Sequence, residues 1–191
     1  LLALVSGGVW AAMQMWNAPE PSRSLRLVLN LPPGGSDSRL DAAGRFGPLG
    51  GSEISPDGRL VAFVAFSGGA GKLWIRPLDS LTAQELPGTE GAGLPFWSPD
   101  SRSIGFFASG QLKRIDVSGG VPVTLCDVTS GRGGTWNTDG VIVFNGYNDG
   151  PLLHIPASGG SPAPLTTIDE KQGENSHPFP QFLPDGRRFL F

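Results

Sequence analysis

The chain has 191 residues, and its 14 basic and 17 acidic residues make up only 16% of it, against about 25% in an average soluble domain. Its 29 glycines and 18 prolines exclude a bundle of long helices, and a net charge of −3 without a long basic run excludes a surface that follows nucleic-acid phosphates. The single cysteine, Cys126, excludes an intrachain disulfide. Because 39% of the residues are hydrophobic, we expect one β-rich globular region with a core.

Residues 1–18 are predicted to form a transmembrane helix. No charged residue precedes Glu20, and a helix that spans a bilayer needs about 20 consecutive apolar residues. Trp10 and Trp16 are of the residue type that gathers at membrane interfaces. Two alternatives stay open: the core of a signal peptide, although no small-residue cleavage site follows, and a buried helix. Residues 19–24 are polar and contain proline, which is typical of a linker.

Residues 25–31 alternate between leucine and other side chains, which predicts a strand with one apolar face. This strand precedes every repeat described below. The chain begins without Met and stops within a strand-like run. We therefore expect both ends to be cuts in a longer polypeptide.

Four stretches in the rest of the chain share an apolar residue, a four-residue turn with Asp at its third position, and an apolar strand. The turns occupy residues 55–58, 98–101, 137–140 and 183–186. Their aspartates stand at positions 57, 100, 139 and 185, at intervals of 43, 39 and 46 residues. A period of about 40–45 residues is typical of the four-stranded blade of a β-propeller.

The chemistry within each unit agrees with a blade. In the turn, Pro presets φ, Asp bonds back to the backbone, and Gly closes it. The run after the first turn is apolar on both faces, as expected of a strand between stacked blades. Further alternating runs lie at 73–78, 112–117 and 152–156, and short outer strands at 84–86, 122–125 and 163–165. Gly-Gly pairs at 119–120 and 159–160 supply positive φ before two of these outer strands.

The sequence thus predicts an all-β fold: a partial β-propeller of about three and a half four-stranded blades over residues 25–191, preceded by a single transmembrane helix. A closed ring has about four to eight blades and must hide its open edges. One chain end often adds a strand to the last blade. We predict that residues 25–31 do so in the parent protein.

The four turns resemble the WD-like repeat of TolB-type propellers, in which a strand, a Ser-Pro-Asp-Gly turn, a basic residue and an apolar strand follow one another. Residues 54–59 and 182–187 match this pattern closely. Ser101 replaces the glycine of the second turn, and Thr138 replaces the proline of the third. The resemblance covers about residues 52–191 and implies a propeller fold.

Three phrases, at residues 73–79, 131–136 and 180–187, are similar to the C-terminal region of bacterial membrane serine/threonine protein kinases. That resemblance implies a cytoplasmic kinase domain before the membrane span and a propeller on the extracytoplasmic, periplasmic side. The same propeller follows winged-helix transcriptional regulators in similar layouts. Similar propellers also stand beside the hydrolase domain of several peptidases.

The visible chain carries no motif of an enzyme. It lacks the kinase motifs and the G-x-S-x-G nucleophile elbow. The glycine-rich stretch at residues 69–72 is interpreted as a hairpin, because Leu73 stands where a phosphate loop needs Ser or Thr. We therefore expect no catalytic, cofactor-binding or metal-binding residue, and no cofactor, in this chain.

Several polar residues are expected to have structural roles. His154 and His177 lack a Cys or a second His at a ligand spacing, so structural or surface roles are expected. The turn aspartates are assigned to turn bonding rather than to a cation. The polar loop at residues 145–150 lacks the spacing of a calcium loop, and Cys126 is interpreted as a small hydrophobe. A group of tryptophans is expected to pack between sheets, with a stacking role toward a sugar or peptide left open for one of them: Trp74, Trp97 and Trp136.

These observations predict a membrane-tethered, extracytoplasmic propeller that binds or senses a protein or peptide ligand and no nucleic acid. The favoured parent, by resemblance, is a receptor-like bacterial serine/threonine protein kinase. The alternatives are a TolB-like periplasmic scaffold that binds proteins, the propeller of a peptidase, and the propeller of a membrane-bound transcriptional regulator.

Overall fold

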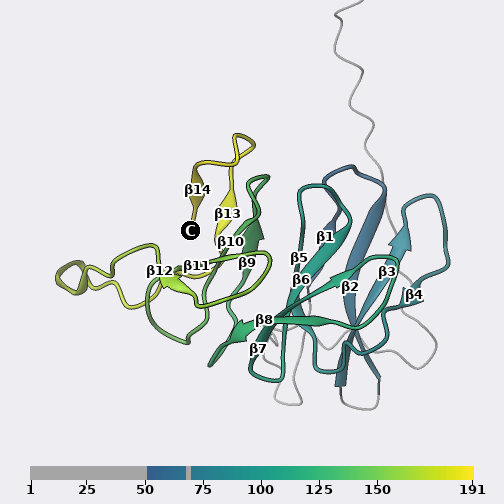
Figure 1. The fold of residues 1–191 in the computed structure, drawn as a ribbon, viewed down its shortest axis with the longest axis horizontal. Helices are drawn as coiled ribbons and strands as arrows, with labels where there is room; N and C mark the ends of the chain where they lie inside the picture. The colour runs from purple at the N-terminus through teal and green to yellow at the C-terminus, as the bar shows by residue number, and fades with distance from the viewer. Residues whose placement is uncertain (1–50, 68–69) are drawn as a thin grey trace, which may run out of the picture.

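The computed structural model describes residues 51–67 and 70–191, which form antiparallel sheets and a single turn of 3₁₀ helix at Glu170–Gln172 (Figure 1). Three of the sheets have four strands each, and a fourth has two. Strands that are consecutive in the chain are neighbours in their sheet. We call the four sheets units 1 to 4.

Unit 1 contains β1 (Ser52–Ile54), β2 (Leu60–Ser67), β3 (Ala70–Pro77) and β4 (Gln84–Glu85). Unit 2 contains β5 (Gly93–Trp97), β6 (Ser103–Ala108), β7 (Gln111–Asp116) and β8 (Val123–Asp127). Unit 3 contains β9 (Gly134–Trp136), β10 (Val141–Phe144), β11 (Leu153–Pro156) and β12 (Ala163–Pro164). Unit 4 contains β13 (Gln181–Phe182) and β14 (Phe189–Leu190).

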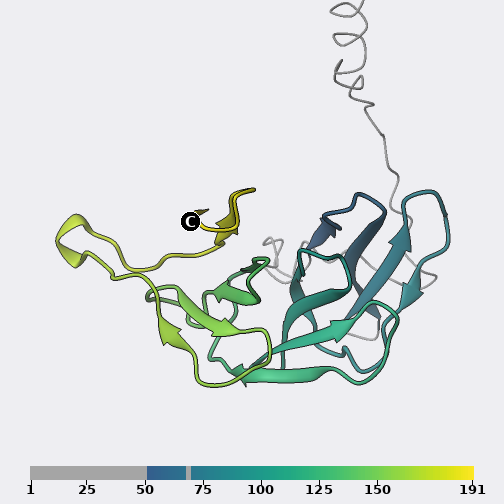
Figure 2. The same ribbon diagram turned by 45° about the horizontal axis from the view of Figure 1, so that its top comes forward.

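The units follow one another in an arc that does not close (Figure 2). The first strands of successive units lie next to one another, because β1 contacts β5, β5 contacts β9, and β9 contacts β13. This arrangement confirms the predicted partial propeller with three four-stranded blades and the beginning of a fourth. The predicted outer strands also form, although β4 ends at Glu85 and β8 begins at Val123.

The predicted transmembrane helix at residues 1–18, the linker at 19–24 and the strand at 25–31 lie outside the described residues. Within the part of the chain that the structure describes, no helix is long and apolar enough to cross a membrane.

Neighbouring units pack face to face through apolar side chains that alternate along the strands. Successive residues of a strand point to opposite faces of its sheet, so β6 supplies core residues on both sides. The cluster between units 1 and 2 includes Ala62, Val64, Leu73, Ile104 and Phe106. The cluster between units 2 and 3 includes Phe107, Leu112, Leu125, Ile142 and Phe144.

The run after the first turn forms β2, and its residues 61 to 65 are all buried. This confirms the prediction that both faces of the run are buried.

Two glycines, one in unit 2 and one in unit 3, leave room for the aromatic ring of Phe96. A Cβ atom added to Gly105 of β6 would lie 2.2 Å from the Phe96 ring, and one added to Gly134 of β9 would lie 2.6 Å from it. Real Cβ atoms essentially never come this close to another heavy atom. The aromatic ring thus fills a slot between two glycines that belong to different units.

Candidate binding site at the turn end of the propeller

The four hairpin turns lie at one end of the molecule, at the upper edge in Figure 1. Turns 1 and 2 share one hydrogen-bond pattern. The Ser55 hydroxyl donates to Asp57 Oδ1 at 2.6 Å and accepts from the Leu60 N–H at 2.9 Å. In turn 2, Ser98 donates to Asp100 Oδ1 at 2.7 Å. These bonds confirm that the first two aspartates organise their own turns.

Hydrogen bonding also lowers the pKa of both aspartates. The Ser55 hydroxyl is the largest cause at Asp57, and the Ser98 hydroxyl is the largest at Asp100. In both turns the N–H of the following arginine adds to the effect. Because each pKa lies below its usual range, both carboxylates are ionised at neutral pH.

The third turn is built differently, and the expectation for its aspartate is wrong. Asn137 stands where turns 1 and 2 have serine, and its Oδ1 accepts from the N–H groups of Asp139 at 3.1 Å and Val141 at 2.9 Å. The amide of Asn137 therefore takes the acceptor role that the aspartate has in turns 1 and 2.

Turn 4 has Leu183 in the serine position, so Asp185 supplies the side-chain acceptors of this turn, beside the backbone bond from the Gly186 N–H to the Leu183 carbonyl. Its Oδ1 accepts from the N–H groups of Arg187 and Arg188, both at 3.0 Å, and its Oδ2 accepts from Arg188 Nε at 2.7 Å. These bonds lower the pKa of Asp185 to about 2. The backbone N–H of Arg188 is the largest cause.

Hydrogen bonds also join some of the turns to one another. The Asp57 N–H donates to the Ser101 hydroxyl at 3.1 Å, which links turns 1 and 2. Asn137 Nδ2 donates to the Gly186 carbonyl at 3.0 Å, which links turns 3 and 4. Below the turns, Trp97 Nε1 donates to the Glu53 carbonyl at 2.9 Å, so the first strands of units 1 and 2 are linked as well.

A hollow of about 450 Å³ opens where the first strands of the four units meet. Two sequence positions line it in every unit. The residue before the turn contributes Ile54, Trp97, Trp136 and Phe182. The second residue of the turn contributes Pro56, Pro99, Thr138 and Pro184. The side chains at these two repeated positions are therefore mainly apolar or aromatic, while other lining residues such as Asn137 and Gln181 give the wall a similar share of polar surface.

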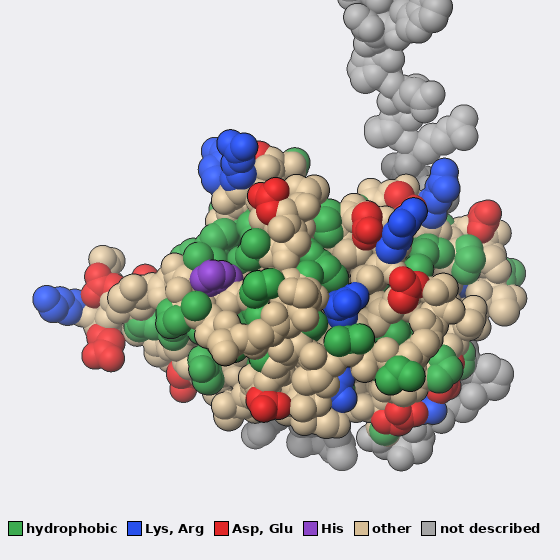
Figure 3. All heavy atoms as spheres, in the orientation of Figure 1, with side chains coloured by type: hydrophobic (Ala, Val, Ile, Leu, Met, Phe, Trp, Pro, Cys, Tyr) green, Lys and Arg blue, Asp and Glu red, His purple; other side chains and the backbone are tan. Residues whose placement is uncertain are grey.

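The degree of burial varies around this wall. Ile54 is 53% exposed, whereas Trp97 is only 7% exposed, and Trp136 and Phe182 are half-buried. Glu53 is the one ionisable residue among the described residues that line the hollow. Partial burial of its carboxylate raises its pKa. In the space-filling view, charged side chains stand along the upper rim, with hydrophobic side chains in the recess between them (Figure 3).

A second hollow, of about 340 Å³, adjoins the first between turns 2 and 3. Its wall consists of Ser98, Pro99, Asp100, Trp136, Asn137, Thr138 and Gly140. Four of these residues also line the larger hollow: Pro99, Trp136, Asn137 and Thr138. Trp136 thus belongs to both spaces, and it also packs against the core between units 2 and 3.

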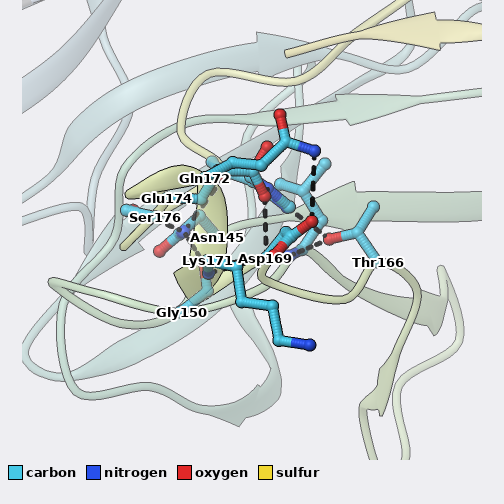
Figure 4. A network of polar contacts seen from close by, with 10 residues as sticks. Asn145, Gly150, Thr166, Asp169, Lys171, Gln172, Glu174 and Ser176 are labelled. Carbon is cyan, nitrogen blue, oxygen red and sulfur yellow. Dashed lines mark hydrogen bonds and ion pairs between the residues drawn. The ribbon is translucent and has the colours of Figure 1, made fainter.

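Away from the hollows, a polar network surrounds the fully buried Asn145 (Figure 4). Its Nδ2 donates to the His177 carbonyl at 3.1 Å, and its Oδ1 accepts from the Tyr147 N–H at 2.9 Å. His177 is itself buried, with Nδ1 2.8 Å from the Thr166 hydroxyl and Nε2 3.2 Å from Glu174 Oε2. The network ties the loop at residues 145–150 to the segment before unit 4.

The remaining residues from the sequence analysis are dispersed. His154 lies in β11 and Cys126 in β8, where burial raises the pKa of the thiol. Lys72 lies in β3 and forms an ion pair with Glu85 at 2.7 Å. In the described ranges, 51–67 and 70–191, no three His, Cys, Asp or Glu side chains gather as a metal site would require. The histidines and the turn aspartates do not come together.

Sequence reasoning did not find the two hollows. A signal for the larger one was present, because an apolar residue precedes the turn in all four units. These four apolar residues form one wall only because the first strands of the units face a common centre. That arrangement becomes visible only once the units are placed in their arc. The smaller hollow depends on the spacing of two turns about 40 residues apart, which no local pattern reports.

No family model matches the sequence, and no curated protein matches it. Solved structures do match. Putative TolB from Agrobacterium tumefaciens aligns with a TM-score of 0.64 and 20% identity, over 78% of this chain and 60% of that one. TolB from Acinetobacter baumannii aligns with a TM-score of 0.57 and 18% identity, over 76% of this chain and 38% of that one. The described residues have the fold of a TolB-type β-propeller.

A structure of a nidogen/laminin complex also matches, with a TM-score of 0.52 and 14% identity, over 65% of this chain and 54% of that one. The chain therefore spans between 38% and 60% of the length of these three structures. At such identities the likeness concerns the fold.

Proposed function

We propose that this chain is a binding module that takes a protein segment or peptide at the turn end of its propeller. The observation that carries the proposal is the hollow of about 450 Å³, whose wall is built from the same two positions in four units. Ligand sites are typically concave and combine apolar and aromatic side chains with polar groups that orient the ligand. Tryptophan and proline side chains offer rigid surfaces for such contacts.

Two further observations support a macromolecular ligand. The hollow is open rather than enclosed by the described residues, and it continues into the second hollow between turns 2 and 3. An extended segment fits such a shape better than a compact metabolite does. One of the matching structures is a nidogen/laminin complex, so this fold also occurs in a complex of proteins.

The test is a selection of random peptides displayed on phage against the full chain. The peptides obtained are synthesised, and their affinities are compared for the wild type and for Ile54→Asp and Trp136→Ala. Both changes should weaken binding about tenfold or more, because Ile54 and Trp136 lie in the wall of the hollow. Since Ile54 is largely exposed, its replacement should leave the fold intact.

Trp74→Ala is the matched control, because Trp74 is half-buried and lines neither hollow. Its effect on affinity should be less than about twofold. Peptides that bind the wild type and both wall variants equally well, or a selection without any specific peptide, would contradict the proposal.

We further propose that the module is tethered to a membrane and belongs to a receptor-like serine/threonine protein kinase, with the propeller on the extracytoplasmic side. Support comes from the uncharged run before Glu20 and from the three phrases at residues 73–79, 131–136 and 180–187. A TolB-like periplasmic scaffold, a peptidase propeller and the propeller of a membrane-bound transcriptional regulator are the alternatives.

Carbonate extraction tests the tether. The full chain should stay in the membrane pellet, and its recovery in the supernatant would contradict the proposal. Sequencing the gene on both sides of this chain distinguishes between the candidate parent proteins. A kinase core upstream supports the favoured one, whereas a winged helix or a cleaved signal upstream, or a nucleophile elbow downstream, supports an alternative.

A further inference from the structure

The rim formed by the four turns is linked at two of its three junctions. Turns 1 and 2 are joined by the bond from the Asp57 N–H to the Ser101 hydroxyl, and turns 3 and 4 by the bond from Asn137 Nδ2 to the Gly186 carbonyl. Among the described residues, no hydrogen bond joins turn 2 to turn 3. The hollow of about 340 Å³ lies at this junction. We call it the notch.

The notch is walled by an aromatic side chain and by a carboxylate that is ionised at neutral pH. Trp136 lines both the notch and the larger hollow, and Asp100 lines the notch from turn 2. Asp100 Oδ1 is occupied by the Ser98 hydroxyl and the Arg102 N–H. No bond within the described residues uses its Oδ2, so one oxygen is available to a ligand.

Turn 3 adds a second acidic group without the usual basic neighbour. In turns 1, 2 and 4 the residue that follows the turn is an arginine: Arg59, Arg102 and Arg187. In turn 3 the same position holds Val141. Asp139 is exposed, and its backbone N–H rather than its carboxylate takes part in the turn. Asp100 is therefore the one charged residue among the described residues that line the notch, and Asp139 stands in the chain between two further lining residues, Thr138 and Gly140.

We propose that the notch recognises a lysine or arginine side chain of a peptide bound in the larger hollow, an inference that rests on the proposed function. A cation placed in the notch would lie beside Trp136 and Asp100, which both line it. Cations bind tryptophan faces by attraction to the ring quadrupole, and carboxylates hold them by charge-assisted hydrogen bonds. A peptide that spans both hollows would place its other side chains against the wall of the larger hollow.

The probe for the test is the set of peptides selected from the phage library on the full chain. The selected peptides should be enriched in lysine or arginine relative to the library. Each peptide is then resynthesised with norleucine in place of the basic residue, which keeps most of the side chain's length and removes its charge. This change should weaken binding to the wild type about two- to fivefold, the range of a partly exposed charge pair.

The same peptides are then measured against two variants of the protein, Asp100→Asn and its matched control, Asp57→Asn. Both aspartates accept from a serine hydroxyl two residues earlier, so the two changes disturb a turn in the same way. Asp57 lines neither hollow. Asp100→Asn should weaken the basic peptides about two- to fivefold and leave the norleucine peptides unchanged, whereas Asp57→Asn should affect neither.

The outcomes separate this inference from the proposed function. If the peptides respond to Ile54→Asp but show neither a basic residue nor a response to Asp100→Asn, the hollow binds peptides and the notch inference is wrong. An equal response to Asp57→Asn and Asp100→Asn also overturns it. If no peptide is selected, or if none responds to Ile54→Asp, both proposals fail.

Discussion

The hydroxyl of Ser101 accepts a hydrogen bond from the backbone N–H of Asp57 at 3.1 Å, and this bond joins two consecutive turns of the propeller. Ser101 has a φ of +61°, in the left-handed region that glycine adopts at the same position of the other three turns. A residue other than glycine costs about 1–2 kcal/mol in this region. The side chain offsets that cost by linking turns 1 and 2.

Replacement of Ser101 by alanine and by glycine tests the link between the turns with and without the strained backbone. Ser101→Ala removes the acceptor and keeps the strained backbone, whereas Ser101→Gly removes both the acceptor and the strain. Amide exchange at Asp57 should accelerate about tenfold in each variant, the size of one lost hydrogen bond. Exchange at Val141, which bonds to Asn137 within turn 3, is the control and should not change. Unchanged exchange at Asp57 would show that the bond does not stabilise the rim.

The fourth turn should be sensitive to acid in a defined range. The pKa of Asp185 falls from its ordinary value of 3.8 to about 2, first through the N–H groups of Arg188 and Arg187 and then through the Arg188 guanidinium. A carboxylate whose pKa is lower in the folded state stabilises the fold above its unfolded pKa and loses this effect as the pH falls through the folded value. Turn 4 should therefore keep the hydrogen bonds to Asp185 at about pH 4 and lose them as the pH approaches 2.

Titration of the Asp185 carboxyl carbon by NMR measures this directly. The midpoint should lie near 2 in the wild type. Arg188→Gln should raise it but leave it below 3.8, because the backbone N–H groups still donate. Arg187→Gln keeps every bond to Asp185 and is the control, with a smaller shift. A wild-type midpoint at 3.8 or above would contradict the described geometry.

Asn145 should be essential for the order of the loop at residues 145–150. Its replacement by alanine leaves the buried His177 carbonyl and the part-buried Tyr147 N–H without their partner. Leaving such groups unpaired costs about 1–3 kcal/mol, so amide exchange at Tyr147 should accelerate at least tenfold. Asn148→Ala is the control, because Asn148 is exposed and only its carbonyl, which the variant keeps, accepts a bond from Arg132. Equal exchange in the two variants would argue against the network.

A polypeptide that stops at Phe191 should self-associate through unit 4. This unit has two strands, and Leu190 on β14 is 63% exposed. An apolar strand with an open edge favours pairing with another chain, and a lysine on the edge opposes it. Leu190→Lys should therefore increase the monomer fraction in sedimentation. Val121→Lys, at an exposed apolar residue outside the strands, is the control. An equal effect of both changes would point to general solubility rather than to the edge.

The units and their turns were predictable because the bonds that define them are local. The bonds within turns 1 and 2 join residues two to five positions apart, and such spacings leave a visible pattern of Ser, Pro, Asp and Gly. The same reasoning predicted that the Asp139 carboxylate accepts the N–H groups of turn 3. It was wrong there, because an asparagine at the first position of a turn competes successfully for the same N–H groups.

Features that join units were not predictable in this way. The Asp57–Ser101 bond spans 44 positions and the Asn137–Gly186 bond spans 49, so neither belongs to a local motif. The departure of Ser101 from glycine is visible in the sequence as a mild exception, but its role requires the position of the neighbouring turn. The notch likewise follows from the relation between two turns rather than from either one.

The slot that holds the aromatic ring of Phe96 bears on how many blades a closed propeller of this kind contains. Gly105 and Gly134 leave room for the Phe96 side chain where a Cβ atom would clash, so an aromatic ring occupies the space between the first strands of units 2 and 3. A wider spacer at the inner side of two wedges reduces the angle between them, and a smaller angle requires more wedges per turn. The Phe96 ring between Gly105 and Gly134 is therefore expected to contribute to the angle between units 2 and 3, and such angles set the blade count, which is about four to eight in this architecture.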